Sequence, residues 1–179
     1  MSEEFAAQLA AARDGGREGF AALYGANNPA LIRFLTGRVG GAADDIAQET
    51  WIAAARGLRR FEGDARSFRA WLFTIAHRQV IQYVRSEARR PAVAADAPAL
   101  ETAAPDDPAA TVTARAAAAA LVAGLAPELA EILLLRVVAG FDADEVGRIV
   151  GKTAGAVRVA QHRALRQIAA RLSEDSVTN

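Results

Sequence analysis

The residues of this chain best suited to chemistry are cationic side chains near its C-terminus. Between positions 152 and 171 the sequence has five positive charges and no acidic residue. They are Lys152, Arg158, Arg163, Arg166 and Arg171. Ammonium and guanidinium groups bind phosphate oxygens, so this run suits a surface that contacts a nucleic-acid backbone. A basic helix face that is merely solvated is the alternative, and the spacing alone leaves both interpretations open.

The element that must position these charges reads as a helix-turn-helix within 142–172. Gly147 is the small residue expected where two helices cross, and Gly151 can take the left-handed conformation of the turn. Val157 can lock the second helix to the first, and Thr153 can cap it. The predicted inward stripe is Val157, Gln161 or Ala160, Ala164, Ile168 and Leu172. The predicted outward face is Arg158, His162, Arg163 and Arg166.

A second basic patch has a different composition. Residues 56–90 carry nine arginines against three acidic residues, and aromatic side chains lie between the arginines. Aromatic rings stack on unpaired bases while guanidinium groups bind phosphates, so the pattern favours single-stranded nucleic acid. Several of the apolar residues have helical spacing and suit a core equally well. These are Trp71, Leu72, Ile75 and Val84.

The whole chain reads as all-α, because strand signals are absent. The expected helices lie in 5–16, on each side of a break at 27–29, in 42–61, in 67–90, and from 112 to 172. Ser67 is the predicted N-cap of the helix expected in 67–90, and Pro91 ends it. Residues 91–111 contain four prolines, four acidic residues and no aromatic side chain, which predicts a flexible acidic Pro/Ala-rich linker.

We therefore expect two small helical domains, at 1–90 and 112–173, joined by the linker 91–111 and followed by a tail at 174–179. The 179 residues balance 21 basic against 21 acidic side chains and include no cysteine. Neutrality argues against strong unaided binding to nucleic acid, and the missing cysteines exclude disulfides and thiolate metal sites. No signal peptide or spanning segment is recognisable, so we expect a cytoplasmic protein without direct membrane insertion.

Three stretches together resemble an alternative bacterial sigma factor of the extracytoplasmic-function (ECF) type. They are AADDIAQETWIAAARGLRRF (42–61), FRAWLFTIAHRQVIQYVR (68–85) and LAPELAEILLLRVVAGFDADEVGRIVGKTAGAVRVAQHRAL (125–165). Their order around a proline-rich acidic spacer strengthens the resemblance, which covers nearly the whole chain. It implies a sigma region 2-like domain, a linker and a sigma region 4-like domain with the helix-turn-helix.

The resemblance also assigns residues to partners. Those implied to bind core RNA polymerase are Asp44, Asp45, Gln48, Glu49 and Trp51. Those implied to capture and melt the −10 promoter element are Phe61, Arg66, Ser67, Arg69, His77, Arg78, Gln82 and Arg85, with 62–67 as the pocket for an extruded base. Those implied to read the −35 element are Arg136, Lys152, Thr153, Ala154, Gly155, Arg158, His162, Arg163 and Arg166.

Some positions depart from the common family pattern. Arg78 and Gln82 stand where relatives usually have Asn and Asp, which leaves the −10 sequence preference open. Val159 and Ala160 replace polar residues, so we expect few base contacts and more readout of DNA shape.

The resemblance implies promoter DNA, core polymerase and an anti-sigma factor as partners, with no cofactor, metal or small-molecule substrate. A stand-alone helix-turn-helix regulator is the first alternative, but it does not explain the aromatic basic helix or the acidic spacer. An enzyme is the second, although Asp44, Asp45 and Glu49 can be imagined as metal ligands. We expect no catalysis, because the two histidines lie in different domains and no nucleophile–base arrangement appears.

Overall fold

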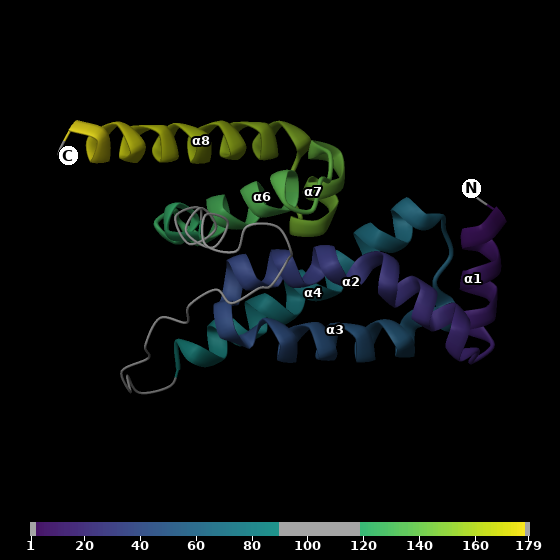
Figure 1. Cartoon of the computed structure of the whole chain (residues 1–179). Coiled ribbons are helices and arrows are strands. Elements are labelled where there is room, and N and C mark those ends of the chain that lie inside the picture. Colours follow the sequence, from purple (N-terminus) through teal and green to yellow (C-terminus); the bar gives the residue numbers. More distant parts are fainter. Residues whose placement is uncertain (1–2, 90–118, 178–179) are drawn as a thin grey trace, which may run out of the picture.

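The structure is a computed structural model that describes residues 3–89 and 119–177. Within these ranges every regular element is helical, and the helices form two domains, as predicted (Figure 1). The first lobe contains α1 (Glu3–Arg13), α2 (Arg17–Val39), α3 (Ala43–Gly57) and α4 (Ala65–Glu87), with 3-10 turns at Gly40–Ala42 and Leu58–Arg60. The second lobe contains the helical residues 119–123, α6 (Pro127–Val137), α7 (Ala143–Val150) and α8 (Ala154–Val177). The predicted linker lies outside the described residues.

Helix α2 runs without interruption through Pro29, where the sequence predicts a break. Proline lacks an N–H donor and disfavours a helix interior. Here the apolar face of the helix is buried in the core, with Leu31, Phe34 and Leu35 fully covered. The buried side-chain amide of Asn27 also donates to the Leu23 carbonyl at 2.8 Å. Tertiary packing therefore outweighs the local cost of the proline.

Two helix boundaries differ from the sequence prediction. Asp64, not Ser67, caps α4, because the backbone N–H of Ser67 donates to the Asp64 carboxylate at 2.8 Å. This hydrogen bond lowers the pKa of Asp64. At the other end of the chain, α8 continues to Val177 and includes most of the expected tail.

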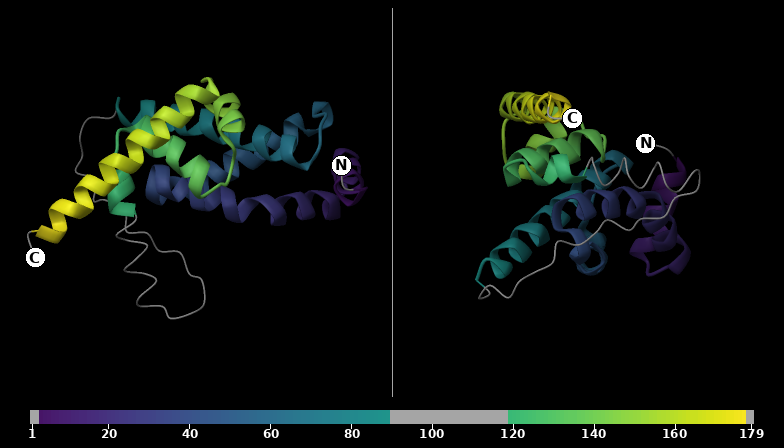
Figure 2. Two further views of the ribbon diagram at one scale, coloured as in Figure 1. Left: turned by 90° about the horizontal axis from the view of Figure 1, so that it is seen from above. Right: turned by 60° about the vertical axis from the view of Figure 1, so that its left-hand side comes forward.

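The two lobes pack against each other, a point that the sequence left open. In Figures 1 and 2 the second lobe lies over one side of the α2–α4 bundle. Helix α8 lies on the side of the second lobe that faces away from this bundle. One hydrophobic core runs through both lobes. Phe141 packs edge-on against Phe73, with ring centroids 4.9 Å apart, and both rings are buried. Leu134 sits so close to Gly37 that a Cβ there would come within 2.9 Å of its methyl groups.

Candidate nucleic-acid interface

The turn between α7 and α8 has the geometry that the sequence predicts. Gly151 adopts the left-handed conformation, with φ 72° and ψ 37°. A Cβ on Gly147 would lie 2.5 Å from the Lys152 carbonyl oxygen, so the crossing requires glycine. The Thr153 hydroxyl accepts from the Ala156 N–H at 3.2 Å, which confirms Thr153 as the cap of α8.

Helix α8 divides cleanly into a buried face and a charged, exposed face. Val157, Ala160 and Ala164 are buried, which places Ala160 rather than Gln161 in the inward stripe. Leu172, also predicted to face inward, is 52% exposed, since α8 extends beyond the body of the lobe. The exposed side chains near the predicted groove contact are Arg158, Val159, His162, Arg163 and Arg166. The four residues predicted to face outward, Arg158, His162, Arg163 and Arg166, are therefore all exposed.

The start of α8 is a second part of that face. Lys152, Thr153 and Gly155 are exposed, and Ala154 is half-buried. The first backbone N–H groups of a helix have no intrahelical partner, and together with the helix dipole they favour an anion such as phosphate. The Lys152 ammonium lies 3.0 Å from the Glu128 carboxylate on the exposed surface. Such exposed pairs are weak and exchange readily for other partners.

Arg136 differs from the other predicted −35 residues. It is half-buried, and its Nε donates to the Gln161 side chain at 2.9 Å. A second guanidinium nitrogen donates to the Phe141 carbonyl. These bonds tie α6 to α8 inside the second lobe, and the predicted DNA contact of Arg136 stays a prediction.

The predicted −10 face on α4 is divided between two environments. Arg78, Gln82 and Arg85 in its C-terminal half are exposed. Ser67 is also exposed, at the start of the helix. The three remaining polar residues bond to the second lobe: Arg66 to Asp142 and Glu145, Arg69 to the Ala139 carbonyl, and His77 to Glu131.

These contacts neutralise the basic face of α4 with acidic groups. The hydrogen bond from Arg66 lowers the pKa of Glu145, although burial of that carboxyl opposes the shift. Glu145 and Asp142 in turn raise the pKa of Arg66. Arg69 lies 4.7 Å from the centroid of the Phe141 ring, and its partial burial lowers its pKa. The Glu131 carboxylate lies 2.6 Å from His77 Nδ1 and 3.7 Å from Arg38.

The predicted polymerase-binding residues lie on α3, at its acidic start. Asp44, Asp45, Gln48 and Glu49 are all exposed and present a continuous acidic and amide surface. Trp51 is instead buried at 5% exposure, and its indole N–H donates to Asn28 at 3.0 Å. It therefore belongs to the core and is not part of the exposed surface that the other four residues form.

Phe61, which stands at the start of the predicted −10 pocket, is also buried in the core. It is 8% exposed and packs on Phe68 and Trp71, so its ring is part of the core. The following loop does border an open hollow of about 710 Å³ between α1 and the start of α4. Its lining from the loop is Glu62, Gly63, Asp64 and Ser67.

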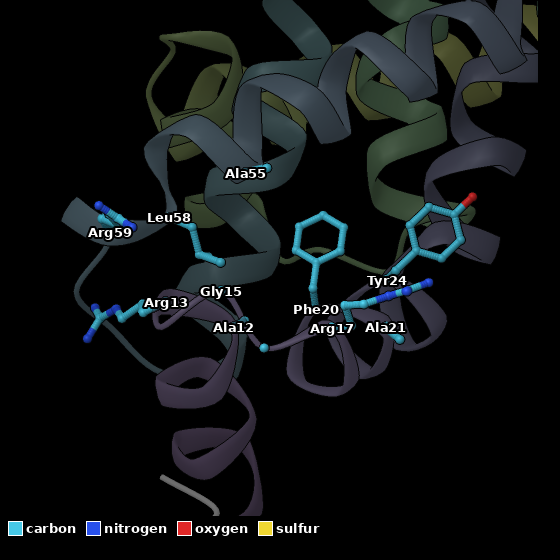
Figure 3. A pocket seen from close by; sticks show the side chains of 11 residues that line it. Ala12, Arg13, Gly15, Arg17, Phe20, Ala21, Tyr24, Ala55, Leu58 and Arg59 are labelled. Carbon is cyan, nitrogen blue, oxygen red and sulfur yellow. The ribbon is translucent and has the colours of Figure 1, made fainter.

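Another hollow, of about 600 Å³, lies between the α1–α2 turn and α3 (Figure 3). Figure 3 shows the Phe20 ring between Leu58 and Tyr24, with the side chains of Arg13, Arg17 and Arg59 at its edges. None of the predicted site residues lines it. It contains no acid–base pair that could perform chemistry on a substrate.

Sequence reasoning missed the acidic residues that face α4. Asp142 and Glu145 form a reciprocal capping box at the start of α7, with both hydrogen bonds at 2.8 Å. The Asp-x-x-Glu spacing before an apolar run signals such a cap and was readable from the sequence. The same two carboxylates also bind Arg66, which is far away in the sequence, and no local sequence pattern indicates this contact.

The described residues offer neither a metal site nor a membrane-spanning helix. No cluster of His, Cys, Asp or Glu in this part of the chain could hold a metal ion. No helix among the described residues is long and apolar enough to span a bilayer.

Comparisons with known proteins bear on both lobes. The family model for sigma-70 region 2 matches residues 23–90, and that for sigma-70 region 4 matches residues 115–168. SigD of Mycobacterium tuberculosis, an ECF RNA polymerase sigma factor, is 34% identical over 94% of this chain and 84% of its own length. BldN of Streptomyces coelicolor, another ECF sigma factor, is 33% identical over 92% of the chain, which spans 64% of that relative.

Solved structures share the fold. CnrH, whose structure was solved in complex with the cytosolic domain of CnrY, superposes with a TM-score of 0.71 at 25% identity. The match covers 94% of this chain and 96% of CnrH. The similarity therefore includes both lobes.

Proposed function

The chain belongs to the extracytoplasmic-function sigma factors, and from this premise we propose how its two domains divide the work of promoter recognition. As a member of this family it is an initiation factor for RNA polymerase and not a catalyst. The first lobe, 1–90, is the domain that docks on core polymerase and takes the −10 element. The second, 112–173, is the domain that reads the −35 element, and 91–111 joins them.

In the first lobe, α3 supplies the polymerase-binding surface and α4 the DNA-binding surface. Exposed Asp44, Asp45, Gln48 and Glu49 support the first assignment, since they form an acidic surface on a rigid helix. Cationic and polar side chains along α4 support the second. These −10 residues are Arg66, Ser67, Arg69, His77, Arg78, Gln82 and Arg85, and the adjacent hollow at 62–67 takes an unstacked base.

In the second lobe, α8 enters the major groove of the −35 element with its N-terminus towards the DNA. The residues in contact are Lys152, Thr153, Ala154, Gly155, Arg158, His162, Arg163 and Arg166. Val159 is 52% exposed on the same face and has no hydrogen-bonding group, so most contacts go to phosphates.

One observation carries the proposal: each lobe has an arginine-rich helix, α4 in the first and α8 in the second, while the chain as a whole has no net charge. A neutral chain gains little affinity for DNA from counterion release. Core polymerase therefore supplies much of the affinity, and the chain supplies the specificity. Its site of action is the cytoplasm, with the polymerase. We also propose that an anti-sigma factor holds it inactive; CnrH, which shares its fold, is known in complex with the cytosolic domain of another protein, CnrY.

Run-off transcription with purified core polymerase on genomic promoter fragments tests this function. We expect specific transcripts only when the chain and core are both present. The absence of specific transcripts, or failure to co-purify with core, would contradict the proposal. Nanomolar sequence-specific DNA binding by the chain alone would favour a stand-alone regulator.

Charge reversal on α3 tests the docking surface. We expect Asp45→Arg with Glu49→Arg to weaken core binding at least tenfold and to leave the fold intact, since both side chains are exposed on one helix face. Titration of labelled core measures the affinity, and circular dichroism measures the helicity. The matched control is Asp14→Arg with Glu18→Arg, an equal charge change on exposed residues elsewhere in the first lobe. Equal affinities of the two double variants would place the docking surface elsewhere.

A further inference from the structure

The hollow between the α1–α2 turn and the end of α3 is lined by basic and apolar side chains (Figure 3). Its described lining includes three arginines and no acidic residue. The arginines are Arg13, Arg17 and Arg59. Among the described residues, none of these three guanidinium groups forms an ion pair. A hollow lined by charges of one sign raises the local concentration of the opposite charge, so this one attracts an anion.

Arg13 supplies a second, independent observation. It is half-buried at the end of α1, and its Nε is covered and has no hydrogen-bond partner among the described residues. A buried N–H group without an acceptor is unfavourable, and a charged donor binds an anionic oxygen more strongly than a neutral donor does. Rotation of this long side chain towards the hollow would bring its guanidinium to an anionic ligand, which would supply the missing acceptor.

Two aromatic rings line the same hollow. Phe20 is half-buried, and Tyr24 is 43% exposed. Both rings pack on buried Trp51, with ring centroids 5.7 Å and 5.0 Å from it. Contact with Trp51 holds the two rings in place, so their uncovered parts form a surface on which a planar ring can stack.

These features together favour one class of ligand. A hollow of about 600 Å³ suits a small molecule, because ligand pockets usually measure about 300–1,000 Å³. A ligand that joins a planar base to a chain of phosphates matches both the rings and the arginines. The residues assigned to the −10 element line other surfaces, so a DNA strand on α4 would have to leave that helix to enter this hollow.

We propose that this hollow binds a free nucleoside triphosphate, whose phosphates contact the three arginines and whose base stacks on the two aromatic rings. The site lies at the end of α3, away from the acidic start of that helix that is assigned to core polymerase. Arg13 also lines the hollow beside the loop 62–67, so the bound triphosphate shares a residue with the neighbourhood of the proposed −10 pocket.

Isothermal titration calorimetry of the purified chain with ATP, GTP, adenosine and inorganic triphosphate tests the site. We expect one triphosphate nucleotide bound per chain. Adenosine lacks the phosphates and inorganic triphosphate lacks the base, so each should bind about tenfold more weakly or worse. No binding of ATP or GTP at millimolar concentration would overturn the proposal. Equal affinities for ATP, GTP and inorganic triphosphate would also overturn it, because the hollow would then be an anion site without a base.

Substitution of the exposed arginines locates the phosphates. Arg17→Ala with Arg59→Ala should weaken nucleotide binding by about tenfold or more and leave the helicity in circular dichroism unchanged, since both side chains are exposed. The matched control is Arg33→Ala with Arg89→Ala, which removes two exposed arginines of the same lobe that do not line the hollow. Equal nucleotide affinities of the two double variants would contradict the proposed location.

Tyr24→Leu tests the stacking of the base. Leucine keeps an apolar contact with Trp51 but cannot stack, so the variant should bind ATP about fivefold more weakly and inorganic triphosphate as before. Unchanged ATP affinity would contradict the assignment of the ring.

A single-stranded oligothymidine is the rival ligand, because it also carries bases and phosphates. If its binding requires Arg17 and Arg59 and neither ATP nor GTP binds, the hollow belongs to the path of a DNA strand and the proposal fails. All these titrations use the chain without polymerase or promoter, so their outcome is independent of the function proposed above.

Discussion

Single side chains at the lobe boundary hold the two lobes together. Glu131 is a carboxylate with 9% side-chain exposure, and its two neighbours, His77 and Arg38, both come from the other lobe. Breaking a buried pair by removal of one partner costs roughly 3–5 kcal/mol, because a charge is left without compensation. Loss of Glu131 would therefore leave His77 and Arg38 without their partner in the other lobe.

Arg158 and Val159 lie side by side on the exposed face of α8 and differ in what they offer DNA. The Arg158 guanidinium is only 3.9 Å from exposed Asp144, a weak pair that DNA can displace. Arg158→Ala should lower promoter affinity of the holoenzyme more than Val159→Ala. A base-reading arginine costs ~1–3 kcal/mol and relaxes one promoter position, whereas a phosphate contact weakens all sequences alike and flattens the salt dependence.

A panel of −35 point mutants measured at several salt concentrations separates the two patterns. We expect the phosphate pattern for Arg163→Ala and Arg166→Ala, and the panel decides the pattern of Arg158→Ala. If Arg163→Ala relaxed a single base position and left the salt slope unchanged, the phosphate assignment of that residue would be wrong.

The carboxyl of Glu145 makes the stability of the folded protein sensitive to acid. Its pKa in the folded protein lies below the usual 4.5, chiefly because Arg66 donates a hydrogen bond to it. A depressed pKa adds stability above the unfolded value, and this contribution is lost as the pH falls through the folded value. Unfolding midpoints should therefore change little from pH 7 to pH ~5.5 and fall below pH ~4.5.

Glu145→Gln isolates this contribution among the other carboxylates, since glutamine can still cap α7 from the same position. The variant should show a shallower acid decrease than the unsubstituted chain in urea denaturation between pH 7 and pH 3. Identical pH profiles would show that the Arg66–Glu145 bond does not stabilise the folded protein.

At the scale of elements, the crossing of α7 and α8 depends on one missing side chain. Gly147→Ala would press a methyl group to 2.5 Å from the Lys152 carbonyl, a backbone atom that cannot move alone. We expect a loss of roughly 1–3 kcal/mol in the free energy of unfolding. Gly155→Ala is the control, because a Cβ there meets nothing within 4 Å, and it should be neutral or stabilise by about 0.4–1 kcal/mol. Similar denaturation midpoints for the two variants would mean that the crossing is not tight.

At the scale of the whole molecule, the shared core links the stability of the two lobes. Phe141 belongs to the second lobe, but its ring packs on Phe73 of the first. Phe141→Ala should lower stability by roughly 3–5 kcal/mol and separate the lobes. Val137→Ala is the control on the preceding helix, because Val137 is 64% exposed. Differential scanning calorimetry of both variants checks this, and an unchanged profile for Phe141→Ala would show that the lobes are energetically independent.

The sequence by itself determined the features that depend on neighbours along the chain. The helical class, the turn at Gly151, the Thr153 cap and the cationic face of α8 all follow from short-range spacing and backbone chemistry. These features form wherever the segment is placed, because their hydrogen bonds and steric limits lie within a few residues. The family resemblance followed from the same local stretches.

Only the tertiary structure decided which of these surfaces are available. Packing carried α2 through Pro29 and buried Trp51 and Phe61, which local patterns could not distinguish from exposed aromatic residues. It also paired Arg66 with Glu145, 79 positions away in the sequence. Contacts between distant segments depend on complementary shape and charge over whole faces, and a linear pattern does not encode them locally. The contacts of Arg69 and His77 with the second lobe, and the exposure of Arg78 and Arg85, are therefore properties of the fold.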